Sequence, residues 1–154
     1  MKKPLFHLVR LAALLGSAVL LLAQGDHTNA FTGTWKLNVA KSKFSPGPPS
    51  QSATVTSTPD GTFMVEGVDG HGKPVKFSHP WSGGKEVPVN GIENATWISD
   101  VRSHTIDDTM KIGGKTVEKI HVVLSPDGKT VTATIDETDA NGQHVHNVEV
   151  FEKQ

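Results

Sequence analysis

The chain has 154 residues, no cysteine and a net charge of −1 at pH 7 with histidine neutral. That length fits a single domain, and a chain without cysteine excludes disulfide-stapled folds and thiol chemistry. Its 15 basic residues form no patch interleaved with aromatic residues, so we predict no nucleic-acid partner.

The N-terminal segment is basic and then apolar. Two lysines near the start precede an apolar run over residues 11–23. This is the layout of a secretory signal peptide, and the run is about five residues short of the roughly 20 that a membrane-spanning helix needs. We predict that residues 1–30 are a signal peptide cleaved after Gly25 or Ala30, the alternative being a retained N-terminal anchor. The mature domain, residues 31–154, is then periplasmic or secreted, with no membrane span.

Beyond residue 31 the apolar residues follow a period of two, which is typical of half-buried strands. Val131, Ala133 and Ile135 alternate with threonines, for example. Turn dipeptides such as Asp127-Gly128 separate these segments and favour tight hairpins. Strands are predicted at 33–39, 52–58, 62–69, 74–80, 95–101, 104–112, 115–124, 129–138 and 145–152.

Consecutive hairpin-linked strands form a meander, and an open sheet of this size would expose two long edges. Closure removes the edges, so we predict an all-β fold, an antiparallel up-and-down β-barrel of about 8–10 strands. The proline-rich segments 45–49 and 87–91 are predicted to be loops at a barrel mouth, because proline cannot donate a hydrogen bond to a sheet.

Both ends of this domain resemble those of a known superfamily. The stretch GTWKL at 33–37 resembles the Gly-x-Trp strand that opens the barrels of calycins, which include lipocalins and fatty-acid-binding proteins. The stretch VFEK at 150–153 is similar to the closing strand of fatty-acid-binding proteins. The resemblance implies a lipocalin-like barrel whose first strand pairs with its last. Its likeness to secreted bacterial lipocalin-like proteins rests on residues 33–49, 67–69, 72–75, 122–129 and 147–154.

Two departures from these families bear on the ligand. Fatty-acid-binding proteins hold the lipid carboxylate with an arginine and a tyrosine on the last strand, where this chain has Glu149 and Phe151. A glutamate repels a carboxylate, so a fatty acid held in that manner is not implied. Lipocalins commonly place an arginine across the tryptophan, and here that packing device is either absent or replaced by Lys153.

The alternation of residues along each strand predicts which side chains face the interior of the barrel. Trp35, Leu37 and Val39 alternate along the first strand and are expected to face inward, Trp35 either as a plug of the barrel floor or as part of a cavity wall. We predict binding or transport of a small hydrophobic ligand; the alternative is a filled barrel that acts as an interaction module for an envelope protein. The predicted ligand-binding residues are Trp35, Leu37, Phe63, Val65, Val75, Phe77, His79, Ile106, Met110, Ile120, Val122, Ile135 and Phe151.

Three histidines are candidates for chemistry. By phase His79 lies on the apolar face, either as a hydrogen-bonded core residue or, beside a carboxylate, as the base of an isomerase or lyase. His144 and His146 share one strand face, a spacing compatible with metal ligation, but the sequence indicates no third ligand, and a solvated pair is the alternative. His121 is expected on the outer face.

Motifs of nucleophilic or phosphate chemistry are not found in the sequence. The adjacent carboxylates at 107–108 and 136–137 alternate between strand faces, so neither pair is suited to act as general acid and base. We therefore predict a binding protein that is not an enzyme, with no metal and no cofactor.

Overall fold

The structure is a computed structural model that describes residues 29–139 and 141–154. The predicted signal peptide falls almost entirely on residues 1–28, which lie outside the described residues. Within the described part of the chain, no helix is long and apolar enough to cross a membrane.

Ten antiparallel strands form one sheet in the described residues, in the order β4-β3-β2-β1-β10-β9-β8-β7-β6-β5. The prediction of an all-β, up-and-down antiparallel barrel is confirmed. The strands are β1 (Gly33–Leu37), β2 (Ser52–Ser57), β3 (Thr62–Val68), β4 (Pro74–Pro80), β5 (Val87–Pro88), β6 (Ala95–Val101), β7 (Thr105–Ile112), β8 (Lys115–Leu124), β9 (Thr130–Thr138) and β10 (His144–Lys153).

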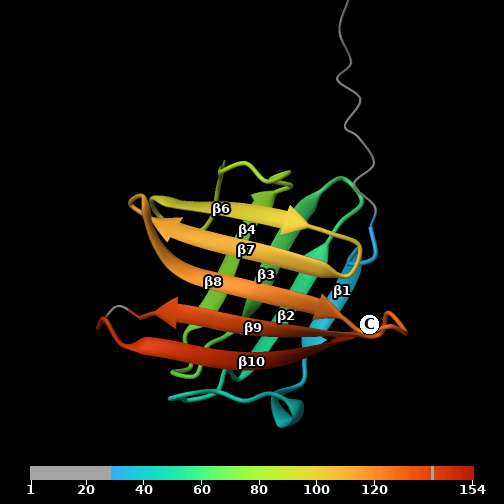
Figure 1. Cartoon of the computed structure of the whole chain (residues 1–154). Helices are drawn as coiled ribbons and strands as arrows, with labels where there is room; N and C mark the ends of the chain where they lie inside the picture. The colour runs from blue at the N-terminus through green and yellow to red at the C-terminus, as the bar shows by residue number, and fades with distance from the viewer. Residues whose placement is uncertain (1–28, 140) are drawn as a thin grey trace, which may run out of the picture.

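The sheet curls until its two ends meet. In Figure 1, β6 to β10 run across the view, and β2 to β4 pass behind them at a steep angle. Ser78 on β4 and Asn90, which follows β5, exchange two backbone hydrogen bonds of 3.0 and 2.7 Å between the first and last strands of the sheet. These two hydrogen bonds join the ends of the sheet and nearly close the barrel.

Strand β1 joins the two halves of the barrel by pairing with β10, as the resemblance implied. The register places Trp35 opposite Lys153 and Leu37 opposite Phe151. Beyond Leu37 the chain leaves the sheet in a short 3-10 turn, η1 (Val39–Lys41), and then continues along β10 in the same direction as β1. Lys43 continues the antiparallel pairing through an isolated bridge to Val148.

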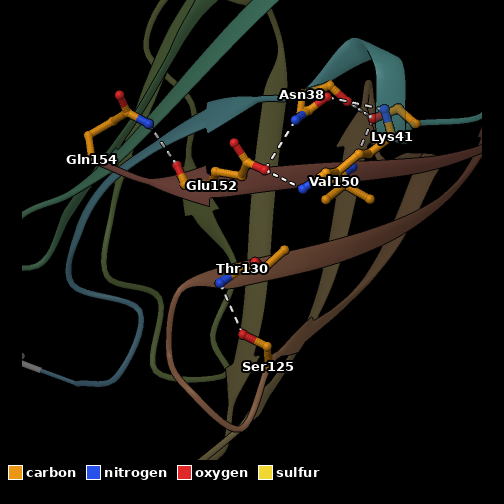
Figure 2. A network of polar contacts seen from close by, with 8 residues as sticks. Asn38, Lys41, Ser125, Thr130, Val150, Glu152 and Gln154 are labelled. Atoms are coloured by element: carbon orange, nitrogen blue, oxygen red, sulfur yellow. Dashed lines mark hydrogen bonds and ion pairs between the residues drawn. The ribbon is translucent and has the colours of Figure 1, made fainter.

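A network of polar contacts holds the turn η1 against strand β10 (Figure 2). The Asn38 side chain accepts a hydrogen bond from the Lys41 backbone N–H and donates one of 3.1 Å to Glu152 Oε1. Lys41 Nζ lies 2.7 Å from the same carboxylate oxygen. Asn38 thus caps η1 and ties it to β10, and the first strand ends here because asparagine favours a cap over a strand.

Two expectations about this region and about the segment at 87–91 were wrong. Val39 does not face inward, since it lies in η1 with 37% of its surface exposed. The segment at 87–91 is not entirely loop, because Val87 and Pro88 pair with Trp97 and Thr96 as β5. Proline is tolerated there because β5 is the last strand of the sheet.

The base of the barrel is a packed apolar core. Phe31 and Trp35 are each 3% exposed and lie in one cluster with Leu124 and Phe151. The Trp35 indole N–H donates a 2.8 Å hydrogen bond to the Phe31 carbonyl oxygen. Lys153 Nζ lies 5.0 Å from the Trp35 ring centroid, a distance at which the ammonium group is attracted to the face of the ring.

Closure depends on a glycine. A Cβ atom on Gly91 would lie 2.6 Å from the Lys76 carbonyl oxygen of β4, and the residue has φ +97°. An alanine there would force the two ends of the sheet apart. The same substitution at Gly114, φ +79°, carries the left-handed backbone penalty of about 1–2 kcal/mol with no atom within 4 Å of the new Cβ.

We therefore expect Gly91→Ala to reduce the free energy of unfolding by at least about 1 kcal/mol more than Gly114→Ala, as overpacking typically does. Chemical denaturation of the two variants and the parent protein measures the difference. Equal losses for the two variants would show that contact between Gly91 and β4 is not needed for closure.

Candidate functional site

The barrel encloses a cavity of about 480 Å³. Phe31, Trp35 and Phe151 line its base, whereas Asp69 and Ile92 line it at the opposite end, which we call the mouth. The turns at 69–73 and 113–114 also lie at the mouth, because β3, β4, β7 and β8 begin or end there. The interior is thus large enough for one small molecule.

Strand phase placed the predicted residues well, with one exception. Leu37 does not border the cavity; it is buried in the core cluster, against which Phe44 also packs. The predicted residues that border the cavity are Trp35, Phe63, Val65, Val75, Phe77, His79, Ile106, Met110, Ile120, Val122, Ile135 and Phe151.

One wall of the cavity is aromatic. His79 on β4 is stacked between Phe63, at a centroid distance of 5.2 Å, and Trp97, at 4.8 Å. Phe77 lies 5.8 Å from the Trp97 ring in a tilted arrangement. Strands β3, β4 and β6 thus present a nearly continuous surface of rings to the interior, suited to an alkyl or aromatic group.

His79 is a core residue of this wall. It is 3% exposed, and its Nδ1 lies 3.0 Å from the Pro80 carbonyl oxygen, so Nδ1 carries the hydrogen and donates it. Burial lowers the pKa of His79 and outweighs the opposing effect of this bond. Among the described residues, no carboxylate is hydrogen-bonded to the His79 ring.

The wall that continues from the aromatic one, which we call the acidic wall, carries four carboxyl groups that were not predicted as site residues. Asp108, Glu118, Glu137 and Glu149 come from the adjacent strands β7, β8, β9 and β10 and all border the cavity. Each shares the phase of an apolar lining residue; Glu118, for example, lies two positions before Ile120. The alternation of side chains along a strand therefore directs these carboxyl groups inward. The sequence prediction missed them because it selected mainly apolar residues as the cavity lining.

Asp108 is held by two donors. The Ser99 hydroxyl donates to Asp108 Oδ1, and the Trp97 indole N–H donates to the same oxygen over 3.0 Å. Burial nevertheless raises the pKa of Asp108 to about 6, because desolvation outweighs these bonds. The outward neighbour, Asp107, pairs instead with His121 at 2.7 Å, so this adjacent pair of carboxylates is split between the two faces as predicted.

Burial raises the pKa of the other three carboxyls, and neighbouring charges add to it. Burial, followed by the charges of Glu137, Glu149 and Asp108, raises the pKa of Glu118 to about 8. Burial and then the charge of Glu137 raise the pKa of Glu149 to about 7, against a hydrogen bond to Asn147. Burial and then the charge of Asp139 raise the pKa of Glu137. Glu118 and Glu149 are therefore partly protonated near neutral pH.

Two lysines near the cavity strands form ion pairs with carboxylates on the outer surface of the barrel. Lys76 Nζ is 2.6 Å from Glu66, and Lys111 Nζ is 2.8 Å from Glu86. Of the described residues that line the cavity, none is a lysine or an arginine. The inward carboxyl groups thus have no basic counterpart in the cavity wall.

The pair His144 and His146 lies on the outer surface. His146 Nδ1 is 2.8 Å from Asp136 Oδ1, and His144 Nε2 is 3.6 Å from the same oxygen. No group of three or more metal-ligating side chains is found among residues 29–139 and 141–154. The pair holds a surface carboxylate and takes no part in the cavity.

The raised pKa of Glu118 predicts a specific dependence of stability on pH. The folded protein retains a proton on Glu118 up to about pH 8, whereas a free glutamate loses it near 4.5. The folded state therefore binds more protons over this range, and its stability falls as the pH rises. We expect Glu118→Gln to remove this loss and to be at least about 1 kcal/mol more stable than the parent at pH 9, with little difference at pH 4.

Denaturant unfolding at several pH values measures this effect. The matched control is Glu66→Gln, which makes the same chemical change in an exposed ion pair on the outer face of β3. Because an exposed ion pair contributes little to stability, this variant should have nearly the same free energy of unfolding as the parent at every pH. A Glu118→Gln curve parallel to that of the parent across the whole range would contradict the prediction.

No protein-family model matches this chain, and no curated protein is significantly similar to it. The fold itself is therefore the finding: a nearly closed, ten-stranded antiparallel barrel, consistent with a lipocalin-like fold and compatible with ligand binding in its interior.

Proposed function

We propose that this protein binds, and thereby carries, one small and largely apolar molecule inside the barrel. The observation that carries the proposal is the open cavity of about 480 Å³, whose base and one wall consist of apolar and aromatic side chains. Ligand pockets typically combine such walls with a few polar groups. A filled barrel that serves as an interaction module does not fit an interior of this volume.

Membership of the calycins and a periplasmic or secreted location are part of the proposal. The pairing of β1 with β10 and the Lys153 side chain over Trp35 support the first. The basic and apolar N-terminal sequence supports the second. Binding without catalysis is also proposed, because His79 is stacked between two rings and bonded to a backbone carbonyl.

A pair of adjacent substitutions on β8 tests the proposal. Val122 borders the cavity, whereas Val123 is 42% exposed on the other face of the strand. We expect an environment-sensitive apolar dye to bind the parent protein saturably at one site. Val122→Phe should weaken that binding at least about tenfold by filling the cavity, and Val123→Phe should leave it unchanged.

Fluorescence titration measures the binding, and thermal unfolding confirms that both variants are folded. Native mass spectrometry of the purified protein then identifies any small molecule that accompanies it. Absence of saturable dye binding, or equal binding by the two variants, would rule out an interior site.

A further inference from the structure

The acidic wall determines which head group the cavity accepts. Glu118 lies three residues from the mouth end of β8, and Glu149 lies near the middle of β10. The base of the cavity, around Trp35 and Phe151, is apolar. A molecule with one polar end therefore fits with its apolar part at the base and its polar end beside these carboxyls.

Glu118 has a free carboxyl group that faces the cavity. Among the described residues, no hydrogen bond or ion pair reaches this carboxyl, and the half-buried side chain borders the cavity. Asp108, by contrast, accepts hydrogen bonds from Ser99 and Trp97. A half-buried carboxyl that borders an open cavity without a protein partner has room for a donor from a ligand.

The charge around the cavity distinguishes between three kinds of head group. A carboxylate or phosphate would meet four carboxyl groups and, in the described lining, no lysine or arginine. A neutral hydroxyl would satisfy one hydrogen bond and leave the mutual repulsion of the carboxyls in place. An ammonium group relieves that repulsion and forms charge-assisted hydrogen bonds.

We propose, building on the binding function above, that the ligand is an amphiphilic organic cation, an amine whose ammonium group lies between Glu118 and Glu149. Its alkyl or aromatic part fills the apolar base and contacts the wall formed by Phe63, Phe77 and Trp97.

Binding of such a ligand is coupled to proton release. The titratable groups that border the cavity together with Glu118 are Asp108, Glu137 and Glu149 on the neighbouring strands, His79 on β4 and Asp69 at the mouth. Burial keeps Glu118 and Glu149 partly protonated in the empty cavity, and an ammonium group lowers their pKa on binding. An alkylamine stays charged up to about pH 10, so its affinity rises from pH 5 to pH 8 as the carboxyls ionise.

Three probes with the same alkyl chain test the head group directly. Decylamine, decanol and decanoate are titrated against the parent protein at pH 8 with the apolar dye bound, and displacement gives the affinity of each. We expect decylamine to bind at least about tenfold more tightly than decanol, with decanoate the weakest. Calorimetry of decylamine in buffers of different ionisation enthalpy should show protons released on binding.

Variants then locate the charge. Glu118→Gln and Glu149→Gln should each reduce decylamine affinity at least about fivefold and reduce decanol affinity by a smaller factor, whereas Glu66→Gln on the outer surface should change neither. Decylamine binding no tighter than decanol in the parent protein would overturn the proposal, and this comparison needs no variant to fold.

The outcomes separate this inference from the function on which it rests. Saturable binding of the dye and of decanol without a preference for decylamine rejects the cation and leaves the binding function standing. Failure of the dye and all three probes to bind rejects both. A preference for decylamine that survives in both Glu118→Gln and Glu149→Gln places the cation elsewhere and rejects the proposed head-group site.

Discussion

The backbone pairing of β1 with β10 is the constraint on which the rest of the barrel depends. All other neighbours in the sheet order are consecutive along the chain, whereas this pair joins strands from its two ends. Its register extends only from Trp35 to Leu37, and closing so long a loop has an entropic cost. Side-chain contacts offset it: Lys153 covers Trp35, and Glu152 holds the turn after β1. Without this pair the cavity would lose its base.

Once that register is set, a period of two decides which side chains face the interior, whatever their polarity. Apolar residues at those positions stabilise the barrel, but Glu118 and Glu149 at equivalent positions cost free energy, because burial disfavours their charged forms. Such local conflict with packing is expected at functional sites. The interior therefore combines a well-packed apolar base with a region of carboxyl groups whose charged forms are disfavoured by burial.

Much of the fold could be predicted from alternation and turn chemistry, because both act between residues close in sequence. All nine predicted strands appear, within two residues at each end. Val39 and β5 were missed, since an Asn38 cap and a pairing of only two residues leave little trace in a sequence pattern. The carboxyl wall was missed for a different reason: Asp108, Glu118, Glu137 and Glu149 come from four strands, and only the register between the strands brings them together.

The seam between β4 and β5 has a consequence for how copies of this protein meet in solution. The prolines within the described strands, Pro74, Pro80 and Pro88, all lie in these two edge strands. Proline offers no N–H, so each removes a donor that another chain could use for strand addition. The two hydrogen bonds between Ser78 and Asn90 occupy the middle of the β4 edge. What remains is a blunted edge, which opposes sheet extension from one molecule to the next.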